Sequence, residues 1–184
     1  MKNLHLDPEN YRDIFQKLIL SGRISAKGHI GTHLDCYTSI PEYKDYEMEA
    51  VIVDCLAKMP DTQLIQKIPC LQGMALILYT RNLESNGYGT ESYFNTDTFL
   101  SEDTLRAILD KHPQFIIIDS HGLGESGKKH VSIDKTCEEH HCHVIENADL
   151  SSLKDIRKIR IKISIDTDNP STGKPCRILW NGSY

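Results

Sequence analysis

Three short apolar runs, each about as long as a strand, constrain most strongly what this 184-residue chain can fold into. They are residues 48–56 (MEAVIVDCL), 73–80 (GMALILYT) and 114–119 (QFIIID). Apolar runs of this length, bounded by polar residues, are typical of buried strands rather than of helices. We therefore expect a sheet that contains all three runs.

Other patterns fall before, between and after these runs. Apolar side chains recur at helical spacing over residues 8–20, Ser101 is a good N-cap for a helix to about residue 110, and residues 133–140 predict a short helix. Further strands are expected at 143–146, 157–166 and 176–180, a long loop at 82–97 and a glycine-rich loop at 121–129. Because strands and helices are interleaved in a chain too short for two domains, the sequence predicts a single domain of mixed α/β or α+β structure over residues 1–184.

Composition argues against several classes of protein. A net charge of −5 does not suit a general nucleic-acid binder, and the basic cluster at 154–162 alternates with isoleucines, which predicts an element with one solvated face. No stretch approaches the roughly 20 apolar residues of a membrane span, and the first residues lack the apolar run of a secretory signal. Six cysteines without a CxxC pair then indicate reduced thiols. We expect a cytoplasmic protein that binds neither nucleic acid nor membranes.

The densest chemical pattern is His29-Ile-Gly31-Thr32-His33-Leu-Asp35. Imidazole and carboxylate together suit zinc or another first-row divalent metal. In a helix Asp35 would point away from the two histidines, and in a straight strand four residues would separate the two histidine backbones by roughly 13 Å. A bend at Gly31 resolves this conflict, because glycine adopts backbone angles that other residues avoid. By spacing alone, two ordinary histidines in a polar turn fit the pattern equally well.

These residues also resemble a known family. HxGTHxD is the first half of the motif HxGTHxDxPxH of the cyclase family, which includes bacterial kynurenine formamidases and isatin hydrolases, and every defined position from His29 to Asp35 matches. The order and spacing of later segments, among them VIEN at residues 144–147, extend the resemblance over roughly residues 27–180. Only the seven-residue motif is specific.

The resemblance implies a fold, an activity and a set of ligands. The fold is the family's α/β architecture, described as swivelling β/β/α, in a homodimer or a larger assembly. The site holds one or two divalent ions, often zinc or manganese, and His29, His33, Asp35 and Glu146 are ligands. The implied activity is hydrolysis of a small amide, formamide or lactam-like substrate, similar to that of arylformamidases, through a metal-activated water.

The second half of the motif departs from the family. Tyr37 and Ser39 stand where the family has proline and its proposed acid/base histidine. The family's remaining ligand histidine aligns with Asp134, and an additional carboxylate favours manganese or magnesium over zinc. His130, four residues earlier, is an alternative ligand. His121 and His130 are the candidates to replace the missing acid/base, although His121 fits a solvent-facing loop residue as well.

Three functions therefore remain open at this level. The first is a metal-dependent hydrolase of a small molecule. The second is a catalytically silent relative that binds a metal and a small ligand, and the third is a dimerising protein without metal.

Overall fold

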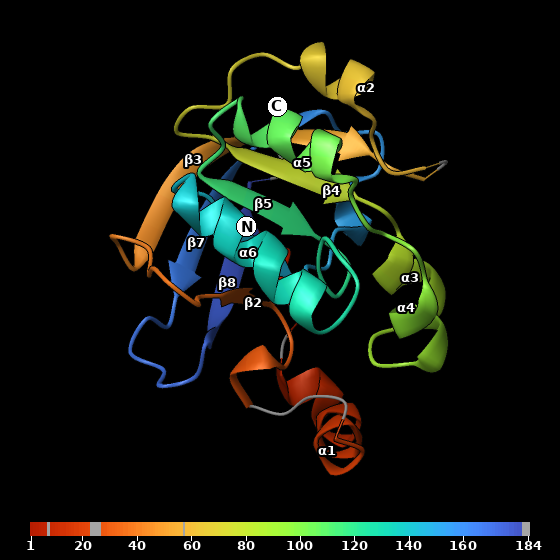
Figure 1. Ribbon diagram of the computed structural model, residues 1–184. Helices are drawn as coiled ribbons and strands as arrows, with labels where there is room; N and C mark the ends of the chain where they lie inside the picture. The colour runs from red at the N-terminus through yellow and green to blue at the C-terminus, as the bar shows by residue number, and fades with distance from the viewer. Residues whose placement is uncertain (7, 23–26, 57, 182–184) are drawn as a thin grey trace.

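The computed structural model describes residues 1–6, 8–22, 27–56 and 58–181 (Figure 1). In these residues the strands form one eight-stranded sheet in the order β1-β8-β2-β6-β5-β4-β3-β7. Because β7 also pairs with β8, seven strands close into a barrel-like ring, and β1 lies beside β8. The strands are β1 (Lys2–Asn3), β2 (His33–Asp35), β3 (Asp45–Asp54), β4 (Ala75–Tyr79), β5 (Phe115–Ile118), β6 (His143–Glu146), β7 (Lys158–Ile165) and β8 (Gly173–Trp180).

Helices cover the outside of the ring. The α-helices are α1 (Arg12–Leu20), α2 (Thr62–Gln66), α3 (Asn82–Asn86), α4 (Glu91–Asn95), α5 (Glu102–Leu109) and α6 (Lys128–Glu139), and the 3₁₀ turns are η1 (Pro8–Tyr11), η2 (Lys27–His29) and η3 (Ser151–Leu153). Figure 1 shows α5 and α6 lying over β4 and β5, and buried residues of α2, α5 and α6 share one apolar cluster with those strands. This is a mixed α/β fold, as predicted.

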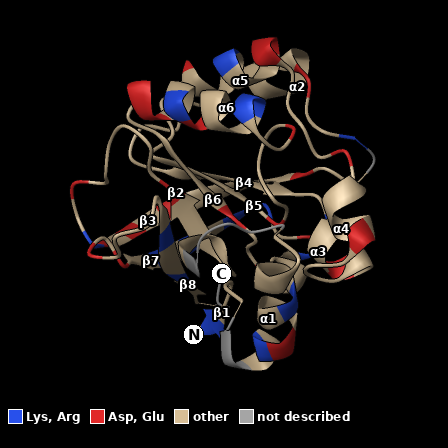
Figure 2. Cartoon of the chain, turned by 60° about the horizontal axis from the view of Figure 1, so that its bottom comes forward, with Lys and Arg blue, Asp and Glu red and all other residues tan. Residues whose placement is uncertain are grey.

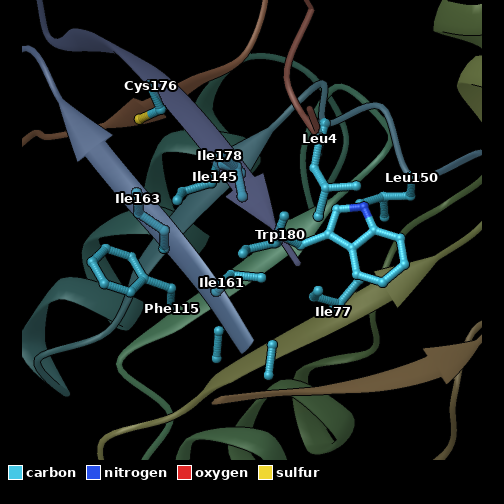
Figure 3. Close-up of a cluster of buried hydrophobic side chains, with 14 of the residues drawn as sticks. Leu4, Ile77, Phe115, Ile145, Leu150, Ile161, Ile163, Cys176, Ile178 and Trp180 are labelled. Carbon is cyan, nitrogen blue, oxygen red and sulfur yellow. The ribbon is translucent and has the colours of Figure 1, made fainter. Parts of the chain in front are cut away.

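The three apolar runs are β3, β4 and β5, which pair in parallel with one another and, through β5, with β6. Alternate side chains of a strand point to opposite faces, so the runs of β4 and β5 are apolar throughout because both of their faces are buried, whereas β3 carries exposed acidic residues such as Glu49. One face packs under α2, α5 and α6. The other fills the ring, where Ile77, Phe115, Ile163, Ile178 and Trp180 are in one buried cluster (Figure 3).

The basic cluster predicted to have one solvated face overlaps the first part of β7, whose residues alternate between exposed and buried. Its outward-facing basic side chains meet acidic ones of β3: Lys158 pairs with Glu49, and Arg160 and Lys162 pair with Glu47. Figure 2 shows that basic and acidic residues are interspersed along α1, α5 and α6 as well. No helix within the described ranges is long and apolar enough to cross a membrane.

The predicted loop at 82–97 and the predicted start of the helix at 133 were wrong. Residues 82–97 are not a long loop, because they contain α3 and α4, which have five residues each and are too short to show a helical period. The helix predicted at 133–140 begins at Lys128. Its first turns were missed because His130, on a buried side of the helix, is polar and faces the site described next.

Candidate metal centre

The segment between η2 and β2 makes the predicted bend. Gly31 has a φ of +71°, a conformation that favours glycine, and its carbonyl accepts hydrogen bonds from His33 Nδ1 at 2.9 Å and from Asn147 Nδ2 at 3.0 Å. Its amide donates to the hydroxyl of Tyr88 at 2.9 Å. Because Nδ1 of His33 carries the proton of this bond, its Nε2 presents a lone pair, the form of imidazole that binds metals.

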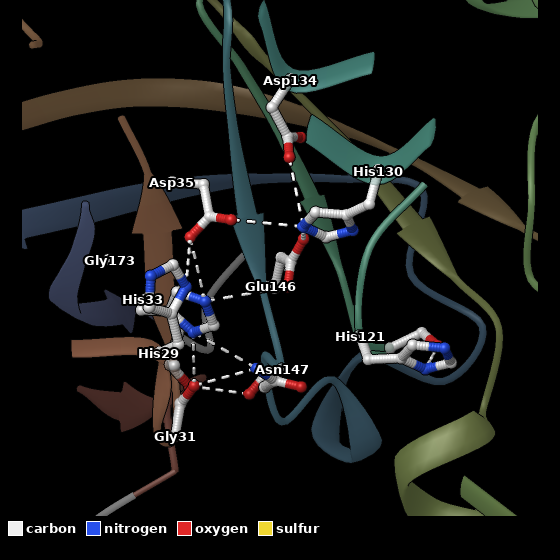
Figure 4. A network of polar contacts seen from close by, with 12 residues as sticks. His29, Gly31, His33, Asp35, His121, His130, Asp134, Glu146, Asn147 and Gly173 are labelled. Atoms are coloured by element: carbon white, nitrogen blue, oxygen red, sulfur yellow. Dashed lines mark hydrogen bonds and ion pairs between the residues drawn. The ribbon is translucent and has the colours of Figure 1, made fainter. Parts of the chain in front are cut away.

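The bend brings the three motif residues together (Figure 4). Oδ1 of Asp35 lies 2.9 Å from His29 Nδ1 and 3.2 Å from His33 Nε2. The second ring nitrogen of His29 lies 2.9 Å from the hydroxyl of Thr172, which fixes the ring. The three ligand atoms of the motif lie within 4.8 Å of one another, close enough for one ion.

A second group of ligand atoms faces the other oxygen of Asp35. His130 Nε2 lies 3.2 Å from Asp35 Oδ2, 3.2 Å from Asp134 Oδ2 and 3.3 Å from Glu146 Oε1. His130 and Asp134 are four residues apart on α6 and therefore share a face of the helix. Both groups contain Asp35, so its two oxygens face two adjacent candidate ion positions.

The donor set fits a divalent cation. Asp35, Asp134 and Glu146 are 1%, 2% and 3% exposed. Asp35 Oδ1, both oxygens of Asp134 and Glu146 Oε1 have no hydrogen-bond partner in the described part of the chain. A buried carboxylate without such partners is costly unless a cation balances it. Buried orphaned oxygens beside three imidazoles are what a divalent metal would satisfy.

Burial and the neighbouring charges shift the pKa values of this cluster in the metal-free chain. Burial raises the pKa of Asp134 to about 7 and that of Glu146 well above its usual value. Burial alone would lower the pKa of His130, but Glu146, Asp35 and Asp134 raise it to about 10. Burial opposes ionisation of Asp35, yet the neighbouring imidazoles of His130, His29 and His33 keep its pKa well below the ordinary range. A bound divalent ion would release these protons.

The cluster forms part of the wall of a cavity of about 990 Å³. This volume admits a small organic molecule beside the candidate ions. The rest of the lining mixes aromatic and polar side chains, among them Tyr37, Tyr88, Phe94, His121 and Lys128.

His121 lies in this cavity but outside the ligand cluster, as Figure 4 shows. Its ring is 5.5 to 6.0 Å from the rings of Tyr93, Phe94 and Phe99, and it is only 9% exposed, so the solvent-facing alternative is wrong. Burial and the charge of His130 lower its pKa to about 4, which leaves the ring neutral at pH 7. His130, the other acid/base candidate, lies inside the ligand cluster instead.

Ser39 does not line the cavity; its hydroxyl lies 3.3 Å from His143 Nε2. Tyr37 does line the cavity, and its hydroxyl donates to Asp35 Oδ2 at 2.9 Å. Burial and the nearby charge of Asp35 raise the pKa of this hydroxyl, which keeps its proton. Sequence reasoning noted Tyr37 only as a departure from the motif. That departure was the available signal for its place in the site.

Comparison with known proteins tests the predicted fold independently of the motif. No family model and no curated protein matches the chain. Among solved structures, a potential metal-dependent hydrolase with cyclase activity matches with a TM-score of 0.63 and 20% identity, over 84% of this chain and 79% of that one. A predicted metal-dependent hydrolase from Bacillus stearothermophilus matches with a TM-score of 0.61 and 18% identity, over 84% and 77%.

A third structure is isatin hydrolase A from Ralstonia solanacearum, with a TM-score of 0.63 and 12% identity, over 83% of this chain and 72% of that one. Identities this low establish the fold and nothing finer. The chain has the fold of the cyclase-type metal-dependent hydrolases, as its HxGTHxD motif predicted.

Proposed function

We propose that this chain is a metal-dependent hydrolase that acts on a small amide, formamide or lactam-like substrate. The observation that carries the proposal is the set of three buried carboxylates, with orphaned oxygens, that meets three imidazoles at the wall of a cavity. The names of the solved structures with this fold, a metal-dependent hydrolase and an isatin hydrolase among them, support the same class of reaction.

Two sets of residues would hold the metal. His29, His33 and Asp35 form one set, and Asp35, His130, Asp134 and Glu146 form the other. The first set, with two imidazoles, suits zinc, whereas the carboxylate-rich second set suits manganese. When bound, a divalent ion polarises the substrate carbonyl and lowers the pKa of water toward neutrality.

The chain's own residues bind and orient the substrate. Tyr88 and Phe94 provide aromatic surface in the cavity and exclude water from one side of a flat, apolar substrate. His121, neutral and enclosed by aromatic rings, presents ring nitrogens that can accept or donate a hydrogen bond. We propose that His121 moves the proton that the family's motif histidine would otherwise move, and that His130 is a ligand.

Four proteins separate these roles in one assay of aryl formamides and cyclic amides: wild type, His121→Ala, His130→Ala and Ser39→His, each checked for bound metal. His121→Ala should keep its metal and lose about 10²- to 10⁴-fold in rate, the usual cost of losing a positioned acid/base. His130→Ala should lose metal as well as rate. Wild-type turnover that survives His121→Ala would contradict the role of His121.

One observation favours a second function, a silent metal-binding relative that retains a small ligand. The motif position of the family's acid/base is Ser39, which contacts His143 rather than the cavity. Under this alternative the metal-loaded wild type turns over none of the substrates. Ser39→His, which restores the family's residue, would then be the variant to gain activity.

We also propose that the chain forms a homodimer, as the resemblance to the family implies. Light scattering across micromolar concentrations tests this assembly. A monomer mass throughout that range would contradict it.

A further inference from the structure

The hydroxyl of Tyr37 contacts the carboxylate that both candidate ion positions share. It donates to Asp35 Oδ2, the oxygen that also faces His130 Nε2 at 3.2 Å. Oδ1 of the same carboxylate faces His29 and His33. The hydroxyl therefore restrains rotation of the carboxylate. Free rotation would swap the positions of the two oxygens or turn them away from the candidate ion positions.

Tyr37 is itself held by a buried carboxylate from a distant part of the chain. Glu138, which is 4% exposed, accepts hydrogen bonds from the backbone amides of Tyr37 at 2.6 Å, Thr38 at 2.5 Å and Ser39 at 2.8 Å. The hydroxyl of Thr38 donates to Glu138 as well. Charge-assisted bonds to three successive amides fix the backbone of residues 37–39 far more firmly than a single contact would.

Glu138 belongs to the helix that carries part of the ligand set. His130, Asp134 and Glu138 are spaced four residues apart on α6 and share one face. The first two face the ion positions, and the third holds residues 37–39. Asp35, Tyr37, Glu138 and the ligands of α6 thus form a closed chain of contacts, so the position of α6 and the orientation of Asp35 are set together.

We propose that Tyr37, anchored by Glu138, is a positioning residue that orients Asp35 as a ligand shared by two metal ions. The inference rests on the proposed metal-dependent function and adds to it two residues outside the ligand set. Residues that hydrogen-bond metal ligands typically change metal affinity by 10- to 100-fold when they are altered. Tyr37 reaches a ligand directly, whereas Glu138 reaches Asp35 through Tyr37.

The test measures metal binding rather than turnover. Tyr37→Phe removes only the hydroxyl, and Glu138→Gln removes the charge that holds the loop. Tyr43→Phe, at a tyrosine that is 57% exposed, and Glu139→Gln, at the exposed neighbour on the same helix, are the matched controls. Dissociation constants for manganese and zinc come from competition with a chelator, ion counts from mass spectrometry, and stability from thermal unfolding in chelator.

Tyr37→Phe and Glu138→Gln should each weaken binding of the ions by 10- to 100-fold, and both controls should bind as wild type does. Because Glu138 acts through Tyr37, the double variant should bind no more than a fewfold more weakly than Tyr37→Phe alone. If Glu138→Gln fails to fold, Thr38→Val, which removes a single donor to Glu138, takes its place with a smaller loss of the same kind.

If Tyr37→Phe binds metal with wild-type affinity and ion count, the inference is overturned. This holds even if the chelator-treated variant unfolds at a lower temperature, because a loss of stability alone would show that the contact is merely structural. Additive losses in the double variant overturn the link through Glu138. A wild-type chain that takes up no ion overturns the inference together with the proposed function, whereas a wild type that binds metal but has no hydrolytic activity overturns the proposed function alone.

Discussion

Replacing Asp134 with asparagine should raise the free energy of unfolding of the metal-free chain and lower its affinity for metal. In the metal-free chain Asp134 is 2% exposed and lies among Asp35, Glu138 and Glu146, so folding penalises its charged form. Its pKa in the folded chain is about 7, compared with an ordinary value of 3.8. An asparagine of nearly the same shape carries no such charge.

The size and sign of the effect follow from these two pKa values. A difference of about 3 units corresponds to on the order of 4 kcal/mol, since one unit is about 1.4 kcal/mol. Because the folded pKa lies above the unfolded one, the contribution of Asp134 is fully present below about pH 4 and is lost as the pH rises through about 7. At pH 8 the metal-free Asp134→Asn chain should therefore be more stable than wild type by up to about 4 kcal/mol, and below pH 4 the difference should vanish.

Urea unfolding in chelator, repeated from about pH 3 to pH 8, measures this difference directly. With excess manganese the advantage of the variant at pH 8 should shrink by most of its value, because an ion at 100 times its dissociation constant adds roughly 2.7 kcal/mol to wild type and much less to a variant that has lost a ligand. Glu139→Gln, at an exposed carboxylate of the same helix, should change neither curve. A metal-free Asp134→Asn chain that is less stable than wild type at pH 8 would refute the reasoning.

Two further substitutions test the packing around the site and the core. Gly122→Ala would place a Cβ 2.5 Å from the ring of His130 and 2.8 Å from Glu146 Oε1. It should therefore weaken metal binding by about 10- to 100-fold, as measured by competition with a chelator. The control Gly73→Ala, also at positive φ but in open space, should bind metal as wild type does. Ile77→Ala, in the filled interior of the ring, should lower the free energy of unfolding by about 2–5 kcal/mol in urea, and a loss below 1 kcal/mol would contradict the packing described.

The sequence predicted the strands and the motif well because both depend on local patterns. The apolar runs of β4 and β5 are unbroken since both faces of these strands are buried, and the bend at Gly31 uses a positive φ that glycine adopts most readily. Closure of the ring by pairing of β7 with β8, and the meeting of β2 with β6 and β8, depend on contacts between distant segments that no local pattern encodes.

The site was predicted only in part for the same reason. Placing the start of α6 at residue 133 left His130 in a loop, where it was a candidate acid/base as well as an alternative ligand. With α6 beginning at Lys128, His130 and Asp134 share a helix face and both reach the cluster. Glu138 was not singled out because its partners lie about a hundred residues earlier in the chain, the farthest being Tyr37 at a separation of 101.

The metal content of the purified chain tests the central claim most directly. Wild-type protein prepared without chelator, or reloaded with zinc or manganese, should carry at least one divalent ion per chain by elemental mass spectrometry. His33→Ala, which removes a buried imidazole 3.2 Å from Asp35 Oδ1, should lose most of that metal while remaining folded. A wild-type chain that stays metal-free under both conditions, or a His33→Ala chain that binds metal as tightly as wild type, would contradict the account.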